Sequence, residues 1–103
     1  MKEYQIIVSN DKKNNAVSLE LKGYLNTTSI LEIKKDISKA IKDAKIINIK
    51  VLDVDDADLS FIQLMYSLRQ KADESKIEFG IELDINQEVL ELFRRSGFSD
   101  TFN

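Results

Sequence analysis

A chain of 103 residues has the size of one ordinary domain, so we expect a single domain over residues 1–103. Of these residues 43% are hydrophobic and 32% are charged, which is the composition of a folded globule and excludes a disordered tail. The 15 basic and 18 acidic residues give a formal charge of −3, so the chain lacks the basic excess typical of nucleic-acid binding.

Histidine and cysteine are both missing from the sequence. Their absence excludes disulfide frameworks, the usual zinc sites, thiolate nucleophiles, Ser-His-Asp triads and phosphohistidine relays, since each of these needs an imidazole or a sulfur. Neither an apolar leader after Met1 nor an apolar run of about 20 residues, the length that crosses a bilayer, occurs. We therefore expect a cytoplasmic protein that is not membrane-embedded and uses no cofactor.

Two segments near the start of the chain alternate apolar and polar residues, over 4–8 and again over 17–21. A period of two residues is typical of a half-buried strand. The polar run Asn10–Asn15 separates them, so the sequence predicts an antiparallel hairpin.

After Gly23 the spacing of the apolar residues changes to three and four, which predicts an amphipathic helix. The residues that follow this spacing are Ile30, Ile33, Ile37, Ile41 and Ala44. Ser29 and Glu32 have the spacing of a capping box, in which each side chain bonds the other residue's backbone N–H, so we expect the helix to begin there.

Alternation returns over 46–54, and a third strand is predicted there. The acidic stretch Asp53–Asp58 is then expected to open a second helix, whose broad apolar face runs from Leu59 to Ala72. A fourth strand is predicted over 77–83, where the alternation is strict, and Asn86 can cap a last helix that Gly97 ends.

The order of elements is therefore β-β-α-β-α-β-α. Helices that link consecutive strands require parallel pairing, whereas the hairpin is antiparallel, so the sheet is mixed. Strands buried on both faces would be apolar throughout, but these are apolar on one side only. The sequence thus predicts an α/β fold in two layers, with all helices on one face of the sheet.

Three segments resemble, in order, the signature regions of the STAS family, the small domains typified by anti-sigma-factor antagonists and also found in sulfate transporters. They are Leu21–Asn26, Asp58–Ile62 and Leu90–Phe98, and they resemble the family's L-x-G-x-L-D, D-S-S-G-L and L-x-x-x-G-L. The resemblance extends over most of the chain, from Tyr4 to Phe102, and the order of elements agrees with it.

The resemblance implies a binding module and not an enzyme. In the partner-switching branch of the family, the antagonist docks on a kinase-like anti-sigma factor through the start of the second helix and the neighbouring loops. That partner phosphorylates a serine at the helix start. The phosphate adds about two negative charges to the docking surface, so release by charge is the expected switch.

This chain departs from the motif at Leu59 and Phe61 in the second region and at Asn26 in the first. Leu59 stands where the phosphorylated serine is found, Ser60 stands at the second serine, and Phe61 replaces the glycine. The phosphoserine switch is thus either lost or moved to Ser60. Asn26 replaces the family's Asp in the first loop, which keeps hydrogen bonding and removes a charge.

The resemblance therefore implies a protein partner, either a kinase-like anti-sigma factor or, as the alternative, the ATPase of a membrane transporter to which the chain is an accessory subunit. The predicted partner-binding residues are Tyr24, Asn26, Thr27, Thr28, Asp58, Leu59, Ser60 and Phe61. Leu59 is expected at the surface because it lies at the turn into the helix, whereas the spacing of Ile62 and Met65 favours the core. A monomer and a weak homodimer both remain open.

One acidic cluster invites a different hypothesis, because carboxylates after a parallel strand can converge on a hard cation. Its members are Asp53, Asp55, Asp56 and Asp58. Their spacing lacks the glycine and the closing glutamate of an EF-hand loop, and acids at a helix start already stabilise the helix dipole. We predict no metal site here, and an enzymatic function would have only this cluster to rest on.

Overall fold

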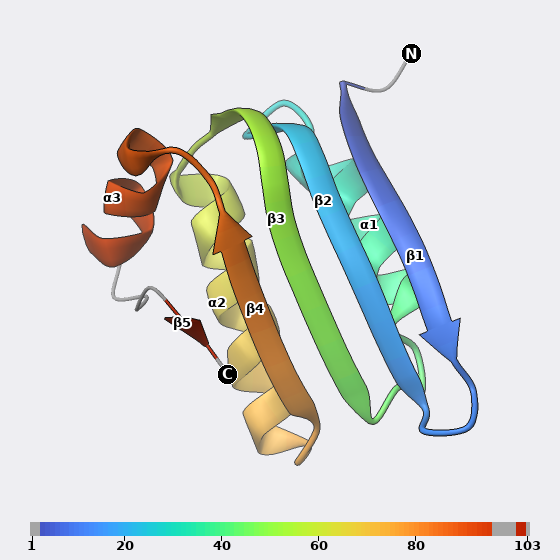
Figure 1. Ribbon diagram of the computed structural model, residues 1–103. Helices are drawn as coiled ribbons and strands as arrows, with labels where there is room; N and C mark the ends of the chain where they lie inside the picture. The colour runs from blue at the N-terminus through green and yellow to red at the C-terminus, as the bar shows by residue number, and fades with distance from the viewer. Residues whose placement is uncertain (1–2, 96–100, 103) are drawn as a thin grey trace.

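The computed structural model describes residues 3–95 and the backbone of residues 101–102. Its elements, in chain order, are β1 (Tyr4–Asp11), β2 (Ala16–Leu25), α1 (Ile30–Ala40), β3 (Ile46–Ala57), α2 (Leu59–Glu74), β4 (Glu78–Asp84), α3 (Gln87–Arg95) and β5 (Thr101–Phe102) (Figure 1). The predicted order is confirmed, and the two-residue strand β5 is added to it. The predicted helix end at Gly97 and Phe98 lies outside the described residues.

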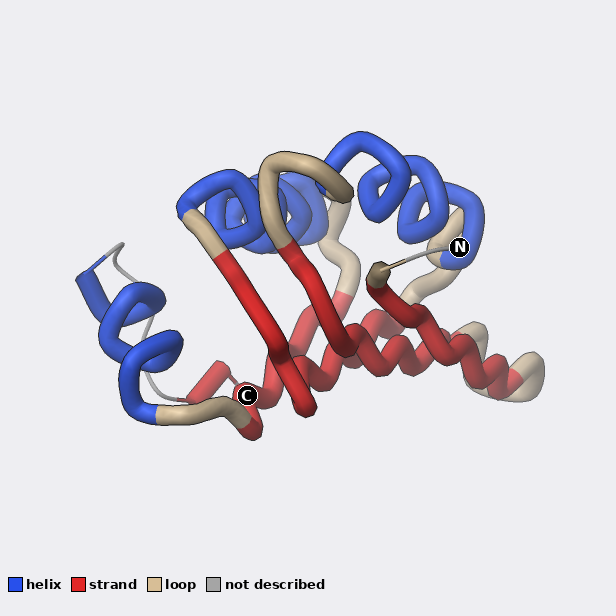
Figure 2. The backbone as a smooth tube through the Cα atoms, turned by 90° about the horizontal axis from the view of Figure 1, so that it is seen from above, coloured by secondary structure: helices blue, strands red, loops and turns tan. Residues whose placement is uncertain are grey.

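The strands form one mixed sheet in the order β1-β2-β3-β4-β5. The hairpin pair β1–β2 is antiparallel, the pairs β2–β3 and β3–β4 are parallel, and β5 returns antiparallel to β4. Figure 2 shows α1 and α2 together on one face of the sheet, while α3 lies beside the sheet at its β4 end. The predicted mixed α/β fold is therefore confirmed, with α1 and α2 as the helical layer, whereas α3 lies at the edge of the sheet and not on the predicted face. Within residues 3–95, no helix is long and apolar enough to span a bilayer.

The core lies between the sheet and the helices α1 and α2, as the alternation of apolar residues predicts. From the sheet it takes the inward residues of the strands, and from the helices one apolar stripe of each. Its fully buried members include Leu19, Leu21, Val51 and Ile81 from strands, and Ile33, Ile37, Ile62 and Met65 from helices. The opposite face of the sheet carries polar side chains, among which Lys50 on β3 lies 3.6 Å from Glu82 on β4.

The predicted capping box at the start of α1 is wrong. Ser29 already has helical backbone angles, and its side chain makes no cap bond. Its hydroxyl instead donates to the carbonyl of Tyr24 at 2.7 Å, beneath the turn that joins β2 to α1. The Tyr4 hydroxyl donates to the carboxylate of Glu32 at 3.2 Å and to the carboxylate of Asp36 at 2.7 Å. Burial and these two carboxylates raise the pKa of Tyr4 above its ordinary value.

The predicted boundary between the third strand and the second helix is also wrong, because β3 continues to Ala57. The acids Asp53, Asp55 and Asp56 therefore lie on the strand and not at a helix start. Asp53 has a positive φ of 48°, and the register between β2 and β3 shifts around Gly23. This irregularity lets the strand continue past the point where its alternation ends.

Candidate functional site

The predicted site residues come from two segments that meet at one end of the sheet. One is the loop from β2 to α1, and the other is the start of α2 just after β3. Because β2 and β3 are parallel neighbours, their carboxyl ends lie side by side, and both segments leave from that end (Figure 1). We call the exposed surface of Tyr24, Asn26, Thr27, Asp58 and Leu59 the loop surface.

Asp58 joins the two segments through its carboxylate. One oxygen, Oδ1, accepts bonds from the backbone N–H of Ser60, at 3.0 Å, and from the Ser60 hydroxyl. The other, Oδ2, accepts from the backbone N–H of Thr27 at 2.9 Å and from its hydroxyl at 2.7 Å. Asp58 is thus the N-cap of α2, as predicted for an acid at the helix start, and it also holds the loop in place.

The ionisation of Asp58 follows from these bonds. Partial burial works to raise the pKa of its carboxyl, but the hydrogen bonds from Ser60 and Thr27 favour the charged form and outweigh burial. They lower the pKa of Asp58 to about 2. The carboxylate is therefore charged throughout the physiological range, beside the one serine that the motif retains.

Asn26 forms a second bridge between the segments. Its amide nitrogen donates to the carboxylate of Asp56 at 2.8 Å, and its Oδ1 accepts from the backbone N–H of Thr28 at 3.0 Å. An aspartate at position 26, as the family motif has, would place two carboxylates against each other. The amide at this position is therefore matched to the acid on β3, which gives a physical reason for the departure from the motif.

Leu59 and Tyr24 are the exposed apolar side chains of the loop surface. Leu59 is 51% exposed, in agreement with its predicted surface position, and Tyr24 is 42% exposed. Thr27 and Thr28 are also exposed, whereas Ser60 is half-buried. Exposed apolar side chains beside polar ones are typical of a protein-interaction surface.

Phe61 was predicted to contact the partner, but it is buried in the core. Its side chain is 0% exposed and packs edge-to-face on Phe93 of α3, with ring centroids 6.2 Å apart and an interplanar angle of 81°. Phe61 lies close to the N-cap of α2 in the chain, but its side chain points into the core, where Phe93 of α3 is its aromatic partner. The predicted contact segment Asp58–Phe61 therefore presents Leu59 and not Phe61.

The acidic cluster does not converge. Asp53 lies 3.8 Å from the ammonium of Lys22, Asp56 accepts from Asn26, and Asp58 binds Thr27 and Ser60. Among the residues that the structure describes, no group of three or more acidic side chains is placed to hold a metal ion. The acids are separated because each of these three is held by a different partner, Lys22, Asn26 or the Thr27–Ser60 pair.

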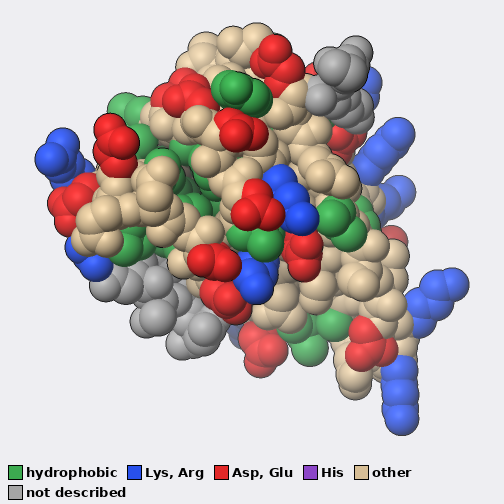
Figure 3. Space-filling model, turned by 45° about the horizontal axis from the view of Figure 1, so that its top comes forward, with side chains coloured by type: hydrophobic (Ala, Val, Ile, Leu, Met, Phe, Trp, Pro, Cys, Tyr) green, Lys and Arg blue, Asp and Glu red, His purple; other side chains and the backbone are tan. Residues whose placement is uncertain are grey.

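Sequence analysis did not predict a groove that adjoins the loop surface. It has a volume of about 580 Å³ and lies between the end of β3 and α3, lined among others by Asp55, Asp56, Glu88 and Arg95. Figure 3, in which this end of the molecule comes forward, shows acidic and hydrophobic side chains intermixed on the surface. Only the packing of α3 beside β3 creates the groove, so no local motif could have indicated it.

The low pKa of Asp58 makes its stabilising effect depend on pH. The carboxyl has a pKa of about 2 in the folded chain, below the value of about 3.9 expected when the chain is unfolded. Its contribution is therefore complete above about pH 4 and disappears as the pH falls through about 2. We expect Asp58→Ala to lower the free energy of unfolding by about 1 kcal/mol at neutral pH, the usual effect of losing an N-cap.

Urea unfolding of both proteins from neutral pH downwards measures this effect. The difference between Asp58→Ala and the unmodified chain should shrink as the pH falls below about 4. Asp53→Asn is the matched control, because this exposed acid has only a long ion pair with Lys22 and an Asn tolerates its positive φ. A difference that stays constant with pH would contradict the role of the charged carboxylate.

The chain belongs to the STAS family, because the model of the STAS domain matches residues 8–103. No curated protein sequence matches it. The family and the fold therefore define a small α/β domain of the STAS type.

Solved structures with the same fold include anti-sigma-factor antagonists. One from Mycobacterium paratuberculosis has a TM-score of 0.73 at 10% identity, with 90% of this chain and 80% of that chain covered. The Bacillus cell fate determinant SpoIIAA in its phosphorylated form has a TM-score of 0.67 at 19% identity, covering 90% of this chain and 84% of that one. Unphosphorylated SpoIIAA has a TM-score of 0.55 at 15% identity, covering 92% and 99%. At these identities the likeness shows the fold.

Proposed function

We propose that this chain is a non-catalytic signalling module that docks on a kinase-like regulatory protein, in the manner of an anti-sigma-factor antagonist. The observation that carries the proposal is the loop surface, where Leu59 is exposed at the start of α2 beside a loop that Asp58 holds in place. Membership of the STAS family and the likeness of fold to anti-sigma-factor antagonists support the same function.

The loop surface has the features of a docking site of moderate affinity. Leu59 and Tyr24 supply apolar area, and the threonines and Asn26 supply polar groups at its rim. Because the loop and the helix start are already joined by hydrogen bonds, little order remains to be imposed when a partner binds. Leu59 is therefore the expected anchor of the interaction.

Affinity purification from native lysate, with the bound proteins identified by mass spectrometry, tests this function. We expect the unmodified chain to retain a protein with a GHKL-type kinase domain, and Leu59→Asp to weaken that binding about tenfold or more, the effect of removing a hot spot. Leu31→Asp is the matched control, since Leu31, the second residue of α1, is a leucine with 79% exposure that is not one of the residues of the loop surface. Equal binding by the two variants would contradict the proposal.

Ser60 is the candidate for phosphorylation in this module. Its hydroxyl donates to Asp58, so a phosphate there breaks that bond and brings new negative charge against an existing carboxylate. The N-terminus of α2 partly offsets this repulsion. Phosphate-resolving mass spectrometry of the natively expressed protein should detect the modification, and its absence across growth conditions would mean that the switch of the family has been lost and not moved.

The alternative function is that of an accessory subunit bound to the ATPase of a membrane transporter. One observation favours it, namely that an exposed leucine stands where the family's switch has its phosphorylated serine. A permanently apolar contact suits a constitutive complex. The same purification separates the two functions, because recovery of an ATP-binding cassette protein in place of a kinase, with the same dependence on Leu59, supports the transporter.

A further inference from the structure

The groove between the end of β3 and α3 has an apolar floor. Val54 and Ala57 of β3 and Val89 and Leu92 of α3 line it, and all four are half-buried and packed against the core. Its volume of about 580 Å³ lies within the range of about 300–1,000 Å³ that is usual for ligand sites. Because the core holds the floor from below, a bound segment would find this apolar surface already formed.

The walls of the groove are acidic. Four carboxylates line it, those of Asp55, Asp56, Glu88 and Glu91, against the single guanidinium of Arg95. Like charges held close together repel one another, and a groove lined by one sign of charge concentrates ligands of the opposite sign. The groove therefore favours a cation over an anion.

Two of these carboxylates are available to a ligand. Glu91 is bound by an arginine of the same helix at 2.9 Å, and Asp56 accepts from the amide of Asn26. Asp55 and Glu88 are exposed, and neither side chain forms a hydrogen bond or an ion pair in the part of the chain that the structure describes. One comes from β3 and the other from α3, so each side of the groove offers a carboxylate.

The groove continues the loop surface. Asp56, which lines the groove, accepts the bond from Asn26 of the loop surface at 2.8 Å, and Ala57 of the floor directly precedes Asp58 in the chain. A typical protein interface takes about 20–30 residues from each partner, so one centred on Leu59 extends beyond the loop surface. The groove lies where such an interface would extend.

We propose that this groove binds a cationic segment of the protein that docks on the loop surface, with an apolar side chain on the floor and a lysine or arginine between Asp55 and Glu88. This role rests on the proposed function, which supplies the docked protein, and it adds the chemistry of the segment that binds here. A lone metal ion is not the occupant, because no three acidic side chains converge among the described residues. An acidic segment is excluded as well, since the four carboxylates would repel it.

Selection from a random peptide library displayed on phage tests the groove without any natural partner. We expect the peptides enriched on the unmodified chain to combine lysine or arginine with a large apolar residue. The double variant Asp55→Asn with Glu88→Gln keeps the shape of both side chains and removes their charges, so it should bind the enriched peptides, made synthetically, at least about tenfold more weakly at low salt. At about 1 M salt, where the Debye length is about 3 Å, most of that difference should disappear.

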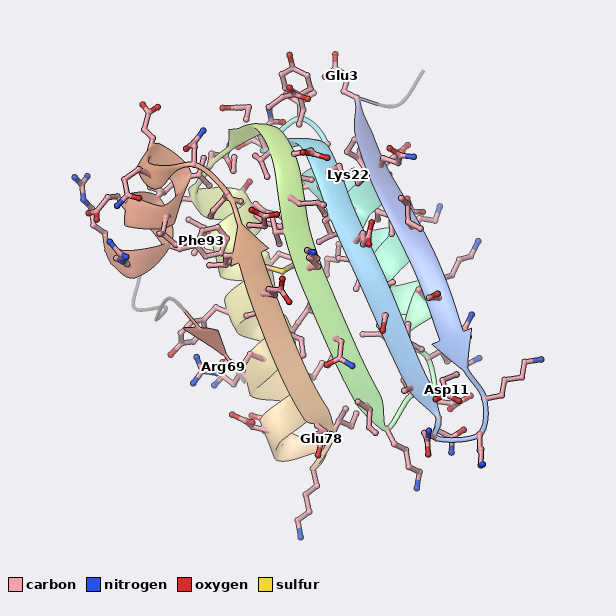
Figure 4. All side chains as sticks on the ribbon, viewed as in Figure 1. Glu3, Asp11, Lys22, Arg69, Glu78 and Phe93 are labelled. Atoms are coloured by element: carbon pink, nitrogen blue, oxygen red, sulfur yellow. The ribbon has the colours of Figure 1, made fainter. Side chains whose placement is uncertain are left out.

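Asp43→Asn with Glu78→Gln is the matched control, because it removes the same charge from the other end of the sheet. Asp43 lies in the loop that leads to β3, and Glu78 begins β4 at the end far from α3 (Figure 4). All four substitutions replace exposed acids by their amides, so urea unfolding should give each double variant the stability of the unmodified chain. Equal loss of peptide binding in the two double variants, or selection of neutral or acidic peptides, would overturn the proposal.

The protein retained by affinity purification separates this proposal from the proposed function. Its binding should weaken about tenfold at low salt with Asp55→Asn and Glu88→Gln and stay unchanged with the control pair. If it binds both double variants equally but still depends on Leu59, the proposed function stands and the role of the groove is wrong. If basic peptides bind through Asp55 and Glu88 but no kinase-like protein is retained, the chemistry of the groove is supported and the proposed function is wrong.

Discussion

Replacing Gly23 by alanine should lower the free energy of unfolding by about 3 kcal/mol, from about 1–2 kcal/mol for a side chain at positive φ and about 1–3 kcal/mol for overpacking. Gly23 has a φ of 91°, and a Cβ there would lie 2.5 Å from the carbonyl oxygen of Glu3. That oxygen is backbone and accepts the bond from Tyr24, so it cannot turn away without breaking the hairpin. The loss is a large fraction of the total stability of about 5–15 kcal/mol typical of a domain.

Denaturant unfolding compares this variant with Gly80→Ala. Gly80 lies within β4, and Gly23 is the one glycine with a positive φ among the described residues. An alanine at Gly80 removes freedom mainly from the unfolded chain, so we expect unchanged or slightly higher stability there. If both variants lost the same stability, close packing at Gly23 would not be the cause.

Replacing Phe61 by alanine should lower the free energy of unfolding by about 3–5 kcal/mol, the range for a buried aromatic residue. Its ring is fully buried at the junction of α2 and α3, where it contacts Phe93. Removing it leaves a cavity and weakens the packing of α3 on the core, to which Val89 and Leu92 also contribute. Calorimetry or urea unfolding should show the loss, and the groove between β3 and α3 should open with it.

Leu59→Ala is the control for Phe61→Ala, because Leu59 lies near Phe61 on the same helix and its side chain is half exposed. We expect a change of less than about 0.5 kcal/mol there, as for most surface substitutions. A double-mutant cycle with Phe93→Ala should give a coupling of about 0.5–1.5 kcal/mol for the ring pair. Additive losses would show that the two rings stabilise the fold independently.

The fold was predictable because its strands and helices have clean periods. Val17, Leu19 and Leu21 alternate, and each is buried as that alternation requires. Ile33 and Ile37 likewise follow the helical period and face the sheet. The periodicity does not predict the residue at which an element ends. The strand β3 runs on to Ala57 through three acids, because pairing with β2 holds it there although its side chains favour a turn.

The motif named the residues of the candidate site, but it did not predict their contacts or the burial of Phe61. The motif alone pointed to Asp58 and Leu59, and the exposed position of Leu59 followed from the turn into the helix. That Asp58 also binds Thr27, 31 positions earlier in the chain, depends on the parallel pairing of β2 with β3. Ser29 and Glu32 had the right local spacing for a capping box, yet Tyr24 and Tyr4 offered them tertiary partners instead.

The carboxylate of Asp58 gives the loop surface a mechanical property. Since it holds Thr27 from one segment and Ser60 from the other, this side chain transmits a displacement of the helix start to the loop. A phosphate on the Ser60 hydroxyl would remove the bond to Oδ1 and repel the same carboxylate whose Oδ2 holds Thr27. A modification at one serine would thereby be felt across both halves of the surface, without any movement of the sheet below.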